Sequence, residues 1–516
     1  MSAALTDAQA FRSPGHRAGS TLSLLDPAGA RPGAATPPAG FDDLRLECAL
    51  AGAGDFQRGA WYLPPSDPGV VGYRQAVVTE LWQPEFRAAA TQLVEATAAA
   101  RRAIDGFRTS HYPLPAEFSL AAAIARFTEG VGAAARRLDA LRPASDGLRG
   151  LAAFLTAYVH GPAFRELAGS TVLRRIRQGT VELGIHQGTV WAEPDAGRPG
   201  WGEQIERIFS RFRESGERPE AGWSRPKRYL NHVEAQAIGL AGGLFPDLFA
   251  ELHRFVGARI DFLPSDLERL TEELRFYLGF LRLVDELSAR GVAWCLPSLS
   301  VDAGGPVRIH GLVDLALAAD SDHPPVANDL TLTADERVVF VTGPNQGGKT
   351  TFARSLGQAA YLAGLGLPIP GRSASLPWSW PVLTHFPAPD DPDHDRGGLA
   401  DELHRLRELM DAAGPRALLI FNELFSATSA ADALQLSARV VERIRGLGCR
   451  VVWVTFLEEL VLDTEGAVSL VGQVEPGDAT RPTFRFRAQP PGGRSHAVAL
   501  AARHGLSSAD LAERLR

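Results

Sequence analysis

Cysteine and lysine are both scarce in this sequence of 516 residues. The cysteines, Cys48, Cys295 and Cys449, are far apart and odd in number, which argues against a disulfide framework and against a zinc site. We therefore expect small core residues and a reducing, cytoplasmic environment. Lysine occurs only at Lys227 and Lys349, whereas arginine supplies all the other basic side chains. A lysine that persists in such a chain marks a place where arginine would not serve.

Long apolar segments are also missing. No run approaches the roughly 18 residues that span a bilayer. The first seven residues have neither the charged nor the apolar region of a signal peptide. We therefore expect a cytoplasmic protein that does not contact a membrane. Association with the nucleoid is compatible with this expectation. The formal net charge is −7, so contact with nucleic acid would need a local basic patch.

Composition divides the chain into three parts. Residues 1–40 are rich in proline, glycine and alanine and predict a disordered tail whose leucines could dock elsewhere. Residues 41–315 show helical periodicity and predict a mainly α-helical domain. Residues 316–516 alternate strand, loop and helix, which predicts an α/β domain with a parallel sheet. The leucines of the tail are Leu22, Leu24 and Leu25.

A small β insertion interrupts the helical part. Two short stretches between residues 180 and 192 alternate like strands joined by a turn. The region around them, 165–228, carries a mild excess of basic residues. This excess fits either a solvated charged face or a contact to the DNA backbone, and the sequence leaves both open. The basic side chains that precede the insertion are Arg174, Arg175 and Arg177.

The most specific motif is Gly343–Thr351, which fits the Walker A pattern G-x4-G-K-[ST]. It lies between an apolar strand, 338–342, and a helix that starts at Lys349. Glycines let backbone N–H groups approach phosphate oxygens, and the helix amino terminus adds the positive end of its dipole. The pattern predicts that Lys349 binds the phosphates of ATP and that the Thr350 hydroxyl binds Mg²⁺. The residues expected to bind nucleotide are Gly343, Pro344, Asn345, Gln346, Gly347, Gly348, Lys349, Thr350 and Thr351.

A second motif ends the apolar stretch 418–422 in Asn422 followed by Glu423. P-loop ATPases usually end this strand in Asp-Glu, in which the Asp holds Mg²⁺ through water and the Glu polarises the attacking water. Asn422 can accept a hydrogen bond from metal-bound water but lacks the charge. The sequence therefore predicts catalysis by Glu423 with Lys349, a metal site of Thr350 and Asn422, and slow hydrolysis.

Taken in order, these motifs resemble the MutS family of mismatch-recognition ATPases. Thr342–Thr351 resembles the family's T-G-P-N-M-G-G-K-S-T, and Asn422–Asp432 resembles D-E-x-G-R-G-T-S-x-x-D. Three further segments are similar to family motifs: Pro325–Leu330, Val454–Leu460 and Gly493–Leu506. The resemblance covers about 320–516. It implies an ABC-type P-loop ATPase domain that binds ATP and Mg²⁺ and pairs with a second copy of itself.

The helical part resembles the family more weakly, through Tyr73–Gln75 and Leu274–Leu278. In that family, lever helices connect the ATPase to a clamp on the DNA backbone, and the β insertion lies where a reduced clamp could sit. The sequence has no room for the family's mismatch-binding and connector domains. Phe127–Glu129 matches the family's Phe-x-Glu wedge by its letters but lies in a helical run.

Several positions depart from the family pattern. Asn422 replaces an Asp, Phe456 replaces a His near the γ-phosphate, and Pro325 stands where the family stacks an aromatic residue on adenine. Gly397 and Gly398 stand near the signature Ser that a partner subunit supplies, whereas Glu402 matches.

The resulting prediction is a short MutS-like, DNA-associated ATPase of the mismatch-repair or recombination type. It would contact the backbone of duplex or branched DNA, through Arg174, Arg175 and Arg177, without reading a mismatch. The alternative is a slow or inactive ATP-gated scaffold that holds a protein partner and needs no DNA.

Overall fold

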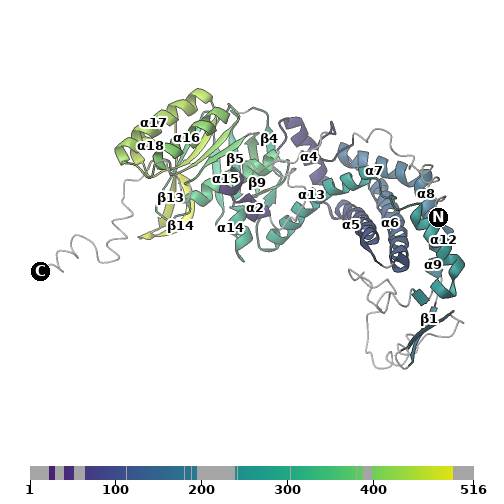
Figure 1. Ribbon diagram of the computed structural model, residues 1–516. Helices are drawn as coiled ribbons and strands as arrows, with labels where there is room; N and C mark the ends of the chain where they lie inside the picture. Colours follow the sequence, from purple (N-terminus) through teal and green to yellow (C-terminus); the bar gives the residue numbers. More distant parts are fainter. Residues whose placement is uncertain are drawn as a thin grey trace. The chain divides into compact units, whose positions relative to one another are not determined.

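The structure is a computed structural model that describes residues 22–29, 40–50, 64–111, 113–178, 181–186, 189–194, 239–240, 242–302, 304–378, 381–387 and 398–491 (Figure 1). These residues form two compact units. The helical unit comprises the described parts of residues 85–143 and 149–271, and the sheet unit comprises those of 21–84, 144–148 and 272–516. Because the units interleave along the chain, the domain boundaries expected near residues 40 and 315 remain a prediction. No helix among these residues is long and apolar enough to cross a membrane.

Helices rich in alanine, leucine and arginine build the helical unit. Proline begins several of them, at a position where its missing N–H leaves no hydrogen bond unmade. Phe127 is fully buried, and its ring meets that of Phe262 edge-on at 5.2 Å. Residues Asp146–Val159 and Pro162–Ala168 form two separate helices, and Gly161 precedes the second as its N-cap. The helices are α5 (Pro84–Thr109), α6 (Pro113–Leu141), α7 (Asp146–Val159), α8 (Pro162–Ala168), α9 (Thr171–Gln178) and α12 (Pro246–Gly257).

A β-hairpin lies where the sequence predicts the β insertion. Its strands are β1 (Val181–His186) and β2 (Thr189–Pro194). They pair antiparallel, with Val181 opposite Pro194 and His186 opposite Thr189. The alternation of residue types in the sequence is therefore that of a hairpin.

The sheet unit is built on a six-stranded sheet of order β10-β11-β12-β7-β13-β14. The first five of these strands run parallel, and β14 is antiparallel to β13. Every residue of β7, β11 and β12 is buried, as expected for continuous apolar strands in a sheet covered on both faces. The strands are β7 (Val338–Thr342), β10 (Val382–His385), β11 (Leu418–Asn422), β12 (Arg450–Val454), β13 (Val468–Glu475) and β14 (Asp478–Ala488).

Helices cover the two faces of this sheet. Phe340, Phe421 and Trp453 point to one face, where they belong to one apolar core with residues of α16 (Gly398–Ala412), α17 (Ala430–Leu447) and α18 (Glu458–Asp463). Alternate residues point to the opposite face. There α15 (Lys349–Gly364) packs so closely that a Cβ at Gly357 would lie 3.4 Å from Ile420. The glycine-rich loop that starts α15 is thereby held at the carboxyl end of β7.

A second sheet, of order β4-β9-β5-β6, completes the sheet unit. Its strands are β4 (Ser298–Ser300), β5 (Val307–Leu312), β6 (Asn328–Leu332) and β9 (Ser373–Pro377), and β3 (Trp294–Cys295) pairs separately with β8 (Ile369–Pro370). Three of these strands, β3, β4 and β5, fall in the stretch for which the sequence indicated mainly helix. In β5 the burial alternates over its first four residues, which is the periodicity of a half-buried strand.

Part of the expected amino-terminal tail is packed into the sheet unit. Leu24 and Leu25 are fully buried, which confirms that these leucines dock. They lie against α4 (Pro68–Leu81) and the part of α13 (Ser265–Ala289) that belongs to this unit. Residues 1–21 and 30–39 of the expected tail lie outside the described residues. Short helices complete the unit: α1 (Gly40–Asp43), α2 (Leu46–Leu50) and α14 (Leu315–Asp320).

Candidate functional site

The loop between β7 and α15 needs its glycines. Gly343 has φ 131° and Gly348 has φ 83°, backbone conformations that side chains rarely allow. A Cβ at Gly343 would lie 2.9 Å from the backbone nitrogen of Gly472, and a Cβ at Gly347 would lie 2.8 Å from the carbonyl oxygen of Pro344. The loop is thus a tight turn whose backbone lies open to a ligand at the amino end of α15.

Lys349, the first residue of α15, turns its side chain back into this loop. Its Nζ donates to the carbonyl oxygens of Gly343 and Pro344 at 3.2 and 3.1 Å, and to Asn345 Oδ1 at 3.4 Å. Burial lowers the pKa of Lys349, and the nearby carboxylate of Glu423 opposes that shift. The ammonium group is therefore held at the loop by long hydrogen bonds to neutral oxygens, a setting that favours a bound anion.

Thr350 and Asn422 meet beside the loop. The Thr350 hydroxyl donates to Asn422 Oδ1 at 2.8 Å. Asn422 ends β11 and is 8% exposed, so its oxygen is fixed in place. The two predicted metal ligands therefore bring a pair of oxygen atoms together, which is the donor type that Mg²⁺ prefers. Both oxygens are neutral.

Glu423 lies at the start of the turn that follows β11. Its φ is 53°, in the left-handed region, and its N–H donates to the carbonyl of Val454 at 2.9 Å. The residue lines the same pocket as Lys349 and Thr350. Phe456 follows β12 and is 52% exposed, so an apolar ring lies at the position where the family has a His.

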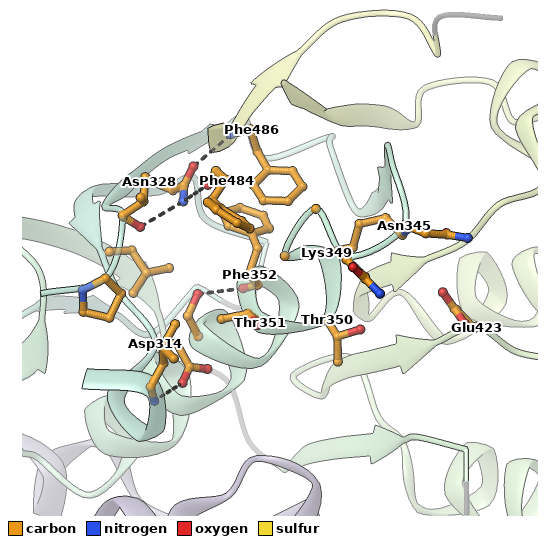
Figure 2. Close-up of a pocket in the computed structure, with 18 residues that line it drawn as sticks. Asp314, Asn328, Asn345, Lys349, Thr350, Thr351, Phe352, Glu423, Phe484 and Phe486 are labelled. Atoms are coloured by element: carbon orange, nitrogen blue, oxygen red, sulfur yellow. Dashed lines mark hydrogen bonds between the residues drawn. The ribbon is translucent and has the colours of Figure 1, made fainter. Parts of the chain in front are cut away.

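A pocket of about 550 Å³ joins these residues (Figure 2). The loop, the first residues of α15 and Glu423 form one part of its wall, and residues of β5, α14, β14 and the segment that leads into β6 form another. Pro325, the position that replaces the family's aromatic residue, also lines the pocket. The lining residues are Leu312, Asp314, Leu317, Pro325, Val326, Asn328, Asn345, Gln346, Gly347, Gly348, Lys349, Thr350, Thr351, Phe352, Ser355, Glu423, Phe484 and Phe486. Gly343, Pro344 and Asn422, also predicted for the site, belong to its loop and to the end of β11.

Three phenylalanines that the sequence interpretation missed form an aromatic wall in this pocket. The rings of Phe352 and Phe486 stack at 4.6 Å. Phe484 is 45% exposed and has φ 58°. In Figure 2, Phe484 and Phe486 lie on the side of Lys349 away from Glu423.

Asn328 fixes this wall through two hydrogen bonds to the backbone of β14. Its Nδ2 donates to the carbonyl of Phe484 at 3.0 Å, and its Oδ1 accepts from the N–H of Phe486 at 2.9 Å. These bonds hold Phe484 in a conformation that is uncommon for a bulky residue. The only signal in the sequence is the alternation of aromatic residues at 484 and 486.

The predicted DNA contacts lie in the helical unit, at the end of α9. Arg174 is exposed, and Arg175 forms an ion pair of 2.6 Å with Glu251 of α12. The side chain of Arg177 lies outside the described residues, as do Gly397 and the motif 493–506. Gly398 begins α16.

Within the part of the chain that the structure describes, no group of three or more His, Cys, Asp or Glu side chains could hold a metal ion.

Comparison with known proteins gives two findings. The family model "MutS domain V" matches residues 339–475. Proteins named DNA mismatch repair protein MutS match part of the chain. That of Granulibacter bethesdensis is 30% identical over 190 residues, which is 36% of this chain and 20% of the relative. That of Lactobacillus delbrueckii subsp. bulgaricus is 28% identical over 217 residues, 42% of this chain and 24% of the relative. The matches thus span about a fifth to a quarter of these relatives' lengths.

Proposed function

We propose that this chain, a member of the MutS family through the domain V at residues 339–475, binds ATP in the pocket at the end of β7 and hydrolyses it slowly. The observation that carries the proposal is the position of Lys349. Its ammonium group is held inside a turn of glycines, at the amino end of a long helix, with neutral oxygens as its partners. A triphosphate would supply the negative charge that this arrangement favours.

Each part of the proposed Walker A loop has a role in phosphate binding. Gly347 and Gly348 carry no side chain, so their backbone N–H groups would approach the phosphates closely. Lys349 exchanges its carbonyl partners for the β- and γ-phosphate oxygens. Arginine is too broad for this loop, which fits the retention of a lysine in a chain that otherwise uses arginine.

Thr350 and Asn422 would hold Mg²⁺, which neutralises charge on the phosphates when it is bound. Glu423 would accept the proton of the attacking water, because it lines the pocket beside Lys349 and Thr350. Slow turnover follows from two positions. Asn422 contributes no charge at the metal, and Phe456 supplies no polar group to orient water.

The aromatic wall would bind the base of the nucleotide. Phe484 presents an exposed ring from β14, on the side of Lys349 away from Glu423. Pro325 and Val326, which also line the pocket, are apolar and suit the flat face of a purine. This chain would thus use a strand residue for the stacking contact that the family makes from the segment containing Pro325.

Association with DNA is the second part of the proposal and rests on the MutS relatives and on the arginines of α9. Contacts from Arg174, Arg175 and Arg177 would go to phosphates, so binding would weaken steeply with salt and would not depend on a mismatch. Two copies would pair through their sheet units, with the nucleotides between them. The work of such a protein would be related to DNA mismatch repair or recombination.

An ATP-gated scaffold is the alternative, favoured by Asn422 and Phe456. It would bind ATP, change shape and hold a protein partner, with negligible turnover and no need for DNA.

ATP turnover by the purified chain tests the proposal. We would measure it with and without duplex and branched DNA, with Glu423→Gln as the blank and Lys349→Ala as the control for binding. Turnover above the blank, raised by DNA, supports the ATPase. ATP binding with turnover equal to the blank in all conditions supports the scaffold.

A further inference from the structure

The turn that carries Glu423 is held in an unfavourable backbone conformation. Glu423 has φ 53°, and Phe425, two residues later, has φ 61°. Residues other than glycine rarely adopt this region, and a bulky residue such as phenylalanine does so at a cost in free energy. The family pattern D-E-x-G places a glycine where this chain has Phe425. The turn therefore lacks the residue that would adopt its shape without strain, and something else has to hold it.

A side chain from a distant helix supplies that hold. The N–H of Phe425 donates to Glu402 Oε1 at 2.8 Å, and Glu402 lies on α16, 23 residues earlier in the chain. A hydrogen bond from a backbone N–H to a carboxylate is among the stronger ones in proteins. The side chains of Leu424 and Phe425 are also held in place, because both are buried in the apolar core that includes residues of α16 and α17.

The other bonds of the turn leave its middle dependent on Glu402. Glu423 donates to Val454, which fixes the first residue to β12. Thr428 donates to the carbonyl of Phe425, which fixes the end. The peptide between Leu424 and Phe425 is fixed by Glu402, and its orientation sets the φ of Phe425 and the direction in which the chain leaves Glu423.

We propose that Glu402 is a positioning residue for Glu423. It holds the strained turn so that the Glu423 carboxylate stays in the pocket beside Lys349 and Thr350. This inference rests on the proposed function, since it assumes that Glu423 acts on the attacking water. Displacement of a catalytic group by about 1 Å can lower a rate on the order of 100-fold, so loss of the hold should appear in turnover.

The test compares Glu402→Ala with Glu402→Gln in the full chain. The amide oxygen of glutamine still accepts from Phe425, whereas alanine cannot. We expect Glu402→Ala to lower kcat by roughly 10- to 100-fold with ATP affinity within about twofold of the original, and Glu402→Gln to restore most of kcat. Glu408→Ala, on the same helix with a side chain 68% exposed, is the matched control and should leave both values unchanged.

A second comparison separates positioning from general damage. In the background of Glu423→Gln, Glu402→Ala should have no further effect on the residual rate, because the two residues act as one unit. If Glu402→Ala fails to fold, Glu402→Asp withdraws the acceptor by one methylene and serves in its place. Unchanged kcat in Glu402→Ala, or equal loss in Glu402→Gln, overturns the inference alone. Turnover of the original chain no higher than that of Glu423→Gln overturns the proposed ATPase and this inference with it.

Discussion

The amide of Asn422 sets the charge that faces the proposed metal position. It lies at the end of β11, and its Oδ1 accepts a hydrogen bond of 2.8 Å from the hydroxyl of Thr350. An aspartate here would keep that hydrogen bond and add a negative charge within a largely buried site, where charge acts strongly. The neutral amide is therefore the simplest physical reason to expect slow hydrolysis.

Replacement of Asn422 by Asp should raise turnover. We expect kcat to increase by roughly 10-fold, on the scale of single electrostatic groups in active sites. The half-saturating Mg²⁺ concentration should also fall. Steady-state rates across a Mg²⁺ titration measure both, and the double variant Asn422→Asp with Glu423→Gln should stay at the blank. A rate in Asn422→Asp no higher than that of the original chain would show that charge at this position does not limit hydrolysis.

His385, at the end of β10, is a buried base next to a cation. Burial and, to a smaller extent, the charge of Arg405 lower its pKa to about 4, and backbone groups of Glu402 and His385 only partly oppose this shift. The side chain is 4% exposed. In the unfolded chain the same ring has its ordinary pKa of 6.5 and takes up a proton more readily.

Stability should therefore fall in acid through His385. Its contribution is complete above pH 6.5 and is lost as the pH falls from there toward 4, because the unfolded state binds the extra proton. By pH 5 the loss should be about 2 kcal/mol. Urea unfolding at pH 7.5 and 5.0 measures it. His385→Gln cannot bind this proton, so its stability should fall less over the same interval; equal losses would contradict the assignment.

The spacing of residues in the sequence predicted the phosphate-binding loop of the pocket but did not predict its aromatic wall. Glycines and Lys349 lie within seven consecutive residues, so a local pattern is enough to identify them. The aromatic wall depends on Asn328 and Phe484, which are 156 residues apart. Glu402 reaches Phe425 in the same way, from another element. Such contacts depend on strand order and packing, which a local pattern does not contain.

Among the elements, the segment Ser23–Asp26 is held by four side chains of the sheet unit. Glu273 accepts from the N–H of Leu24 at 2.6 Å, and Tyr277 donates to its carbonyl at 2.7 Å. The neighbouring carbonyls of Ser23 and Leu25 accept from Tyr73 and Arg74. The segment thus ties α4 to α13, and Gly366, just past the end of α15, packs against Arg74 with space for no side chain.

Truncation of Leu24 should destabilise the sheet unit. The side chain is fully buried, so Leu24→Ala should lower the free energy of unfolding by about 2–5 kcal/mol. Leu22, which is only half-buried, provides the control, and Leu22→Ala should cost clearly less. Urea unfolding followed by tryptophan fluorescence measures both. Equal small effects of the two substitutions would mean that the segment adds little to stability.

Whole elements were predictable where their burial was uniform. β7 has the bounds that the sequence predicts and α15 begins at Lys349 as predicted, because a mainly apolar run and a glycine-rich loop before a helix each favour one structure. β4 was missed because it has three residues and is mostly exposed, and β5 was missed because buried and exposed residues alternate in it instead of forming a continuous apolar run. Their place in a sheet is decided by partners distant in sequence, β9 and β6.

On the scale of the whole molecule, charge restricts how DNA could bind. The chain has a net charge of −7, so its overall field repels DNA and a local patch has to overcome it. The pocket belongs to the sheet unit, whereas the arginines of α9 belong to the helical unit. Changes at the arginines should therefore leave ATP binding intact, which allows the two properties to be measured separately.

Reversal of Arg174, Arg175 and Arg177 to Glu should abolish DNA retention while ATP affinity stays the same. For the original chain, affinity should fall linearly with salt on logarithmic axes, and three phosphate contacts should contribute up to about 3 to that slope. The control reverses Arg407, Arg439 and Arg443, which are exposed in the sheet unit and give the same net charge. Equal loss in both triple variants would assign binding to net charge alone. Undiminished DNA binding by the α9 variant would show that α9 is not the contact.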